Sequence, residues 1–171
     1  SKKMLNKINE LSKTEFTEVF GNIFENASWI AERLYEQKPF KNFKDMSKKM
    51  ISIFEGSNNQ NKLKIIISHP DLADQTKIAS LTADSNKEQN NAGLDLCTKE
   101  EFSEFKNLNL KYKSKFGFPF IIAIKEKNKS EILVNFKKRI LYDKPTEFNE
   151  AIMQIKKIAN FRLDELKIKF L

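Results

Sequence analysis

The sequence contains few residues that end helices and almost none that could cross-link loops. Its 171 residues include four glycines, four prolines and one cysteine, Cys97. So few turn-forming residues argue against a sandwich or barrel of many strands. A single cysteine excludes an internal disulfide and suits a reducing compartment. Because the first residues also lack an apolar signal region, we expect a cytoplasmic location.

Residues for a metal site and for a membrane span are also scarce. One cysteine and one histidine, His69, cannot form a zinc site of the Cys/His kind, and no calcium or magnesium loop motif is present. The longest apolar run covers residues 116–124, and Gly117 and Pro119 interrupt it. A run this short cannot cross a bilayer. We therefore expect no bound metal and no membrane partner.

Arginine is rare although the chain is basic. The sequence has 31 lysines and arginines against 23 acidic residues, which gives a net charge of +8, yet arginine occurs only at positions 33, 139 and 162. Nucleic-acid-binding surfaces usually combine clustered arginines with aromatic residues, whereas the lysines here are spread evenly. We expect no nucleic-acid partner, and we keep a basic helical nucleic-acid module only as an alternative.

Apolar residues, in contrast, are abundant and recur with helical spacing. Fifteen phenylalanines and a 40% hydrophobic content are sufficient for one buried core in a chain of this length. No window alternates strictly between apolar and polar residues, so the pattern predicts helices rather than strands. We predict an all-α, single-domain bundle of about seven to eight helices over residues 1–171. The predicted helices lie near residues 12–24, 28–38, 46–56, 63–68, 98–116, 130–141 and 146–166.

Two regions do not fit a simple bundle. Residues 68–96 are polar and contain the only histidine, and residues 116–124 are apolar but interrupted. A buried segment around a glycine and a proline has backbone N–H and C=O groups that need partners. Those partners are either a neighbouring helix or a bound anion or carbonyl, and the sequence leaves both open.

His69 is the first candidate for an acid/base catalyst at neutral pH, because the ordinary pKa of histidine lies near 6.5. Pro70 prevents the preceding helix from continuing, so the imidazole projects from a defined position. A lone histidine can equally be a surface or structural residue. The residues around it do not by themselves decide between these roles.

Residues 85–89, Ser-Asn-Lys-Glu-Gln, also allow two interpretations. Ser85 and Glu88 have the spacing of a helix capping box, which needs no ligand. A helix N-terminus can alternatively hold a polar ligand. The amide of Gln89 both donates and accepts hydrogen bonds, which suits a ureido or carboxyl group.

Arg162 occupies an unusual position in the last predicted helix. It falls on the same stripe as Ile155, Ala159 and Leu166, so it faces the apolar side of the helix. A buried guanidinium needs an acidic partner or an anionic ligand. The partner is either a core carboxylate, such as Glu88 or another, or the substrate. We expect Arg162→Met to leave the stability nearly intact and to reduce turnover.

Taken together, these segments resemble the 2-oxo-4-hydroxy-4-carboxy-5-ureidoimidazoline (OHCU) decarboxylases of urate degradation. The resemblance extends over about residues 12–166. Its matching residues and segments are Phe24–Arg33, Pro39–Phe40, His69–Ala73, Leu81–Thr82, Ser85–Gln89, Ala92–Asp95, Asn109, Tyr112, Lys115–Ile121 and Ile158–Leu163.

The resemblance implies a cofactor-free, all-helical and usually dimeric enzyme that converts its substrate to (S)-allantoin and CO₂. It implies that His69 is the catalytic acid/base. The residues that it implies hold the substrate are Ser85, Glu88, Gln89, Phe120, Ile121, Ile122, Ala123 and Arg162. We expect in addition that Glu88 acts in catalysis by orienting the imidazole or the substrate ring, and that Pro70 contacts the substrate. A non-catalytic helical interaction domain remains the alternative, and it would leave His69, Glu88 and Arg162 far apart.

Overall fold

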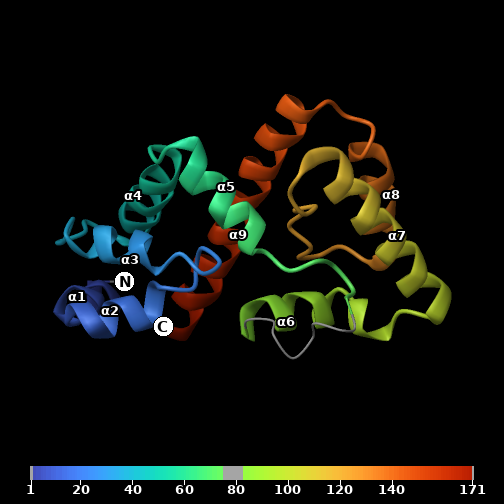
Figure 1. Ribbon diagram of the computed structural model, residues 1–171. Coiled ribbons are helices and arrows are strands. Elements are labelled where there is room, and N and C mark those ends of the chain that lie inside the picture. The colour runs from blue at the N-terminus through green and yellow to red at the C-terminus, as the bar shows by residue number, and fades with distance from the viewer. Residues whose placement is uncertain (1, 75–82, 171) are drawn as a thin grey trace. The chain divides into compact units, whose positions relative to one another are not determined.

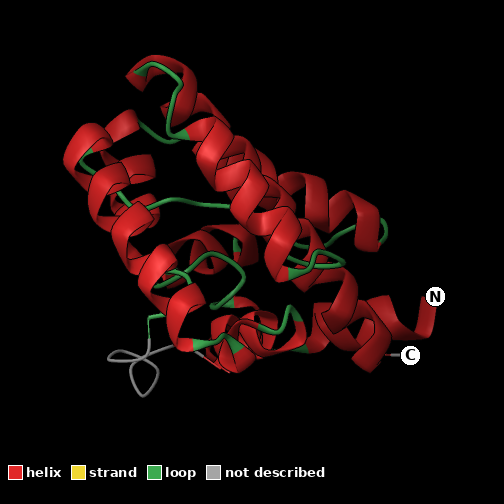
Figure 2. Ribbon diagram, turned by 90° about the vertical axis from the view of Figure 1, so that its right-hand side faces the viewer, coloured by secondary structure: helices red, strands yellow, loops and turns green. Residues whose placement is uncertain are grey.

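The computed structural model describes residues 2–74 and 83–170, and within these ranges it contains nine α-helices and no strand (Figure 2). The predicted all-α class is therefore confirmed, and the number of helices is slightly higher than predicted. Two helices have no counterpart among the predicted ranges. One, α6 (Ala83–Asn91), was suggested only by the possible capping box of Ser85 and Glu88, and the other, α1 (Lys2–Glu10), was missed. The apolar residues of α1 are Met4, Leu5 and Ile8, of which Met4 and Ile8 are buried, and three residues are too few for a clear periodic pattern. Leu81 and Thr82 lie outside the described residues.

The chain forms two compact units. Figure 1 labels the helices and colours the chain by residue number, from blue at the N-terminus to red at the C-terminus. The first unit comprises Ser1–Ile65 and Lys156–Leu171, and the second comprises Ile66–Ile155. The first unit contains α1, α2 (Lys13–Phe20), α3 (Ser28–Tyr35), α4 (Phe43–Glu55), most of α5 (Asn59–Ser68) and the end of α9 (Lys144–Phe170). The second contains α6 (Ala83–Asn91), the 3₁₀ helix η2 (Leu94–Leu96), α7 (Lys99–Phe116), α8 (Lys129–Arg139) and the start of α9.

Capping boxes begin three of these helices. Ser12 and Glu15 form the predicted box of α2, and Thr98 and Glu101 form that of α7. Asn128 provides a third box, at α8, which the sequence analysis did not identify. The capping-box interpretation of Ser85 and Glu88 is wrong, because both residues lie inside α6, which already begins at Ala83.

The core of the first unit surrounds an irregular segment between α2 and α3. The periodic pattern predicts a helix as far as Phe24, but α2 ends at Phe20 and residues 21–27 form turns. Phe24 nevertheless stays buried, and its ring stacks on Phe54 of α4 with the centroids 4.9 Å apart. Apolar burial thus continues beyond the helix, which explains why the apolar pattern overestimates its length.

The core of the second unit is an aromatic cluster around Tyr112 of α7. The ring of Tyr112 lies 4.5 Å from that of Phe116 and 5.4 Å from that of Phe120, measured between centroids. Phe120 stacks on Phe136 of α8 at 3.9 Å. Gly117 ends α7 with φ +79°, a conformation that strains other residues, and its N–H bonds the Lys113 carbonyl. This turn directs residues 118–124 into the core as buried, irregular backbone.

Candidate active site

His69 begins a turn that other elements of the second unit hold firmly. The helix α5 ends at Ser68, and the His69 N–H still donates to the Ile66 carbonyl at 3.2 Å. The next residues are fixed from α7: Lys113 Nζ lies 2.5 Å from Asp71 Oδ2, and Asn109 Nδ2 donates to the Leu72 carbonyl at 3.1 Å. The backbone that carries His69 is therefore positioned by polar side chains on its C-terminal side.

Gln89 of α6 binds the same turn with both ends of its amide. Its Oε1 accepts the Ala73 N–H at 3.1 Å, and its Nε2 lies 3.4 Å from the Asp71 carbonyl. Ser85 lies one helical turn earlier on the same buried face, whereas Glu88 is partly exposed. The structure thus brings together the two segments that the sequence analysis singled out, the His-Pro-Asp-Leu turn and the Ser-x-x-Glu-Gln helix.

The irregular segment 120–123 has partners on three sides. The Ile121 carbonyl accepts from Arg139 Nη1 at 2.6 Å, and the Ala123 N–H donates to Gln154 Oε1 at 3.0 Å. The Ala123 carbonyl accepts from Lys127 Nζ at 2.8 Å. Neighbouring side chains thus satisfy these backbone groups, as one of the two interpretations expects. Among the described residues, no protein acceptor bonds the Ile122 N–H.

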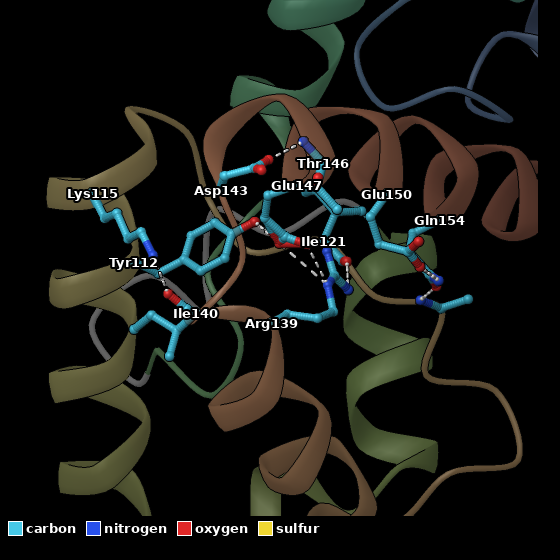
Figure 3. Close-up of polar contacts among 11 residues, drawn as sticks. Tyr112, Lys115, Ile121, Arg139, Ile140, Asp143, Thr146, Glu147, Glu150 and Gln154 are labelled. Atoms are coloured by element: carbon cyan, nitrogen blue, oxygen red, sulfur yellow. Dashed lines mark hydrogen bonds and ion pairs between the residues drawn. The ribbon is translucent and has the colours of Figure 1, made fainter.

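Arg139 belongs to a buried polar network that joins three helices (Figure 3). Its Nε donates to Glu147 Oε1 at 2.7 Å, and Tyr112 Oη donates to Glu147 Oε2 at 2.5 Å. The exposed fraction is 5% for Arg139 and 0% for Glu147, so the pair is shielded from water. Burial, and then the hydrogen bond to Glu147, raises the pKa of Tyr112 well above its ordinary value. Tyr112 therefore remains a proton donor to the carboxylate.

The helix α7 connects the two halves of the candidate site. Asn109 and Lys113, one turn apart, contact the turn that follows His69. Tyr112, on the same helix, packs against Phe120 and bonds the carboxylate that holds Arg139. Residues 69–73 and 120–123 are thus positioned by one helix, within one unit.

Arg162 lies in the first unit, and its partner is Glu25. Its Nη1 is 2.9 Å from Glu25 Oε2 and also donates to the Asn22 carbonyl at 3.1 Å. Arg162 is 4% exposed and Glu25 is 2% exposed, so the apolar helical stripe correctly predicted a buried arginine. The partner of Arg162 is therefore a carboxylate of the core, as one of the alternatives expects, but it is Glu25 and not Glu88. The expectation that Arg162→Met leaves stability intact is therefore reversed, and a contact of Arg162 with substrate stays a prediction.

Arg139, Glu147 and Gln154 were not among the site residues predicted from the sequence. Arg139 follows Lys137 and Lys138 at the end of a helix, a position where cations usually face solvent. One feature of the sequence could have indicated that Arg139 is buried: it lies three residues after Phe136, at helical spacing, on the apolar face of its helix, as Tyr112 does on its own helix.

Groups of three His, Cys, Asp or Glu side chains that could hold a metal do not occur in the described ranges 2–74 and 83–170. None of the described helices is long and apolar enough to cross a membrane.

Comparison with known proteins gives consistent results. A sequence model of the OHCU decarboxylase family matches residues 9–164. An OHCU decarboxylase from Haloferax volcanii is 32% identical over 94% of this chain and 94% of its own length. One from Xenopus laevis is 34% identical over 95% of this chain and 93% of its own length. A solved (S)-allantoin synthase superposes with a TM-score of 0.75 at 25% identity, over 95% of this chain and 53% of that one.

A further relative is much longer than this chain. The uric acid degradation bifunctional protein of Bacillus sp. strain TB-90 is 43% identical over 95% of this chain, which corresponds to 32% of the relative. The chain thus spans about a third of that protein. A solved OHCU decarboxylase has the same fold as this chain. It superposes with a TM-score of 0.67 at 21% identity, over 91% of this chain and 98% of that one.

Proposed function

Because the chain belongs to the OHCU decarboxylase family, we propose that it decarboxylates 2-oxo-4-hydroxy-4-carboxy-5-ureidoimidazoline to (S)-allantoin and CO₂. The observation that carries the proposal is the bond between Gln89 and the Ala73 N–H, which joins α6 to the turn that bears His69. A catalytic histidine needs fixed surroundings to act on one atom of a small substrate. The turn after His69, which Gln89 and Asn109 hold by hydrogen bonds, can provide such surroundings.

The chemistry proposed requires no metal and no organic cofactor. The substrate carbon that loses CO₂ carries a hydroxyl group and neighbours a C=N bond. When the bond to the carboxylate breaks, its electron pair forms a C=C bond with the neighbouring carbon, and the C=N pair moves to nitrogen, which takes up a proton. The resulting enol then loses its hydroxyl proton while the neighbouring carbon gains one, which gives the product carbonyl. The substrate itself accepts the electrons.

In this proposal His69 takes the hydroxyl proton, or stabilises the hydroxyl group while the carboxylate leaves. Glu88 orients the imidazole or the substrate ring from α6. Protonation by one fixed acid delivers the proton to one face of the planar intermediate, which explains a single enantiomer of allantoin. Pro70 and Ser85 line the same region and contact the substrate.

The polar groups of Gln89 and Ile122 complete the proposed substrate site. An amide nitrogen carries two hydrogens, and Gln89 Nε2 uses one of them for the Asp71 carbonyl, so the other is available to a ureido or carboxyl oxygen. The Ala123 N–H is engaged with Gln154. We therefore assign the role of donor to substrate in the segment Phe120–Ala123 to Ile121 and Ile122, and Phe120 and Ala123 provide walls.

The remaining properties belong to the same proposal. We propose a homodimer located in the cytoplasm, with a small-molecule substrate and without a nucleic-acid partner. The homodimer rests on the family resemblance alone. The composition supports the location and the absence of a nucleic-acid partner, because three arginines do not make a phosphate-binding surface and one cysteine suits a reducing compartment.

Turnover of freshly generated substrate tests the proposal directly. The purified chain is mixed with the substrate, and the optical rotation of the allantoin formed is followed together with CO₂ release. We expect rapid formation of (S)-allantoin as the single enantiomer, against slow formation of the racemate without protein. A rate and a product ratio equal to those of the protein-free control would contradict the proposal and favour an interaction domain.

A further inference from the structure

We infer that Arg139 is a positioning residue for the decarboxylation, acting through the Ile121 carbonyl on the donor group of Ile122. The inference rests on the proposed function and extends it to a residue that does not touch the substrate. It depends on four contacts of the second unit: Tyr112 with Glu147, Glu147 with Arg139, Arg139 with Ile121, and Gln154 with Ala123.

The peptide group between Ile121 and Ile122 is held at its carbonyl end by Arg139. A trans peptide is planar, and its C=O and N–H bonds point in opposite directions. Arg139 Nη1 holds the Ile121 carbonyl at 2.6 Å, as Figure 3 shows. The Ile122 N–H, at the other end of this peptide group, must therefore point away from the guanidinium. One contact at the carbonyl fixes the direction of the donor.

The next peptide group, between Ile122 and Ala123, is held at its other end by Gln154. Its N–H end is held by Gln154 Oε1 at 3.0 Å, so its carbonyl, that of Ile122, points away from Gln154. Both peptide groups that flank Ile122 are thus held at one end by a side chain. The other two ends, one donor and one acceptor, both belong to Ile122, and they have no partner among the described residues.

The positive charge of Arg139 acts on the same peptide group that the guanidinium binds. A hydrogen bond from a cation to a carbonyl polarises the peptide group, and hydrogen bonds in such chains strengthen one another. The guanidinium on the Ile121 carbonyl therefore makes the Ile122 N–H a stronger donor toward negative charge. Because the pair is buried, water screens this effect little. Negative charge that develops as CO₂ leaves is stabilised by such a donor.

The guanidinium of Arg139 is itself held by neighbouring side chains. Both oxygens of Glu147 lie within 3.3 Å of its Nε, and its guanidinium carbon lies 4.3 Å from the centre of the Phe120 ring. Glu147 is fixed in turn by Tyr112 and lies in the first turn of α9, where the helix dipole favours a carboxylate. Contacts to a carboxylate, a ring and a carbonyl leave the guanidinium a single orientation.

The test compares Arg139→Met and Arg139→Lys with Ile132→Ala, a truncation of a fully buried side chain on the same helix, α8. The kinetic constants are measured well below each unfolding midpoint. We expect Arg139→Met to lower kcat about 10- to 100-fold, as displacement of a transition-state donor does, with a smaller change in KM. Lysine keeps the charge and one donor, so Arg139→Lys should recover part of kcat. Ile132→Ala should keep the wild-type kcat.

A double variant, Arg139→Met with Glu147→Gln, guards against a failure to fold. It leaves no unpaired charge and keeps an acceptor for Tyr112, so it should fold and show the same loss of kcat as Arg139→Met. If the wild type turns over and both methionine variants match Ile132→Ala in kcat, the inference is wrong while the proposed function stands. If the wild type itself does not turn over, the proposed function fails, and the inference fails with it.

Discussion

Each unit contains one buried arginine that pairs with a glutamate and bonds a carbonyl of irregular backbone. In the first unit Arg162 pairs with Glu25 and bonds the Asn22 carbonyl, in the segment that follows α2. In the second unit Arg139 pairs with Glu147 and bonds the Ile121 carbonyl, in the segment that follows α7. The same chemistry thus supports an apolar, non-helical segment twice.

The two segments differ in what they carry. Residues 22–25 contain none of the predicted site residues, whereas residues 120–123 contain four of them. The Arg139 pair also has a third member, because Tyr112 donates to the same carboxylate. A buried ion pair is expensive to form and is weak evidence for stability alone. The Arg162 pair supports a segment that carries no predicted site residue, whereas the Arg139 pair supports the segment to which we assign a role in catalysis.

Removing one partner of the Arg162 pair should have the largest effect on stability. Arg162→Met leaves the buried carboxylate of Glu25 without its cation, which should cost about 3–5 kcal/mol in the free energy of unfolding. Chemical denaturation followed by circular dichroism measures this cost. Replacing both residues, in Arg162→Met with Glu25→Met, should restore much of the stability, because no charge remains buried.

The kinetics of the same variant test the other role of Arg162. A destabilised Arg162→Met that keeps its kcat and KM at low temperature would make Arg162 purely structural. A stable variant with a severe loss of turnover would instead contradict the comparison, and would restore the substrate contact that the sequence predicts.

Tyr112→Phe should have a smaller effect, confined to the second unit. It removes a hydrogen bond to a buried carboxylate, which is worth about 1.5–3 kcal/mol. The effect should depend on pH. Because the folded protein raises the pKa of Tyr112, its contribution is complete below about pH 10, where unfolded tyrosine is protonated, and is lost as the pH rises toward the folded pKa.

Denaturation of the wild type and of Tyr112→Phe between pH 7 and pH 11 checks this sign. The difference between the two free energies of unfolding should be constant up to about pH 10 and should then decrease. A difference that increases with pH would mean that Tyr112 does not act as a proton donor to Glu147.

The predicted capping boxes provide a matched pair of small changes, one in each unit. Ser12→Ala and Thr98→Ala each remove a side chain that accepts a backbone N–H in the first turn of a helix. Each should cost about 1 kcal/mol in the free energy of unfolding. If the two units unfold together, both variants lower the same single transition in calorimetry. Two transitions, each lowered by one variant only, would show that the units unfold separately.

Chelation should have no effect on turnover, because the proposed chemistry uses the substrate as its own electron acceptor. Activity after exhaustive dialysis against EDTA should equal the activity before it. A loss that a divalent cation restores would overturn the cofactor-free part of the proposal.

The sequence predicts this fold better than it predicts the contacts within the site. Apolar periodicity located the long helices and the buried Arg162, because a stripe in a long helix is a repeated signal. It overestimated α2, since burial of Phe24 continues after the helix has ended. Spacing also suggested a cap at Ser85, although α6 begins two residues earlier and buries that side chain.

The missed contacts all connect residues that are distant in the sequence. Gln89 was interpreted as a ligand for substrate, but its amide also holds the turn after His69. Arg139 follows two lysines and has the local pattern of an exposed helix end. Only the fold reveals that its neighbours are Glu147 and the Ile121 carbonyl, because no short-range pattern encodes a contact 18 residues away.

The central claim is that His69 performs the acid/base step of an OHCU decarboxylation, and the stereochemistry of the product under His69→Ala tests it most directly. Wild-type protein and folded His69→Ala are each supplied with fresh substrate, and the rate and enantiomeric excess of allantoin are measured. The claim predicts (S)-allantoin from the wild type, a rate about 10²–10⁴-fold lower for the variant, and racemic product from the uncatalysed remainder. A folded His69→Ala that produces (S)-allantoin at the wild-type rate would contradict it.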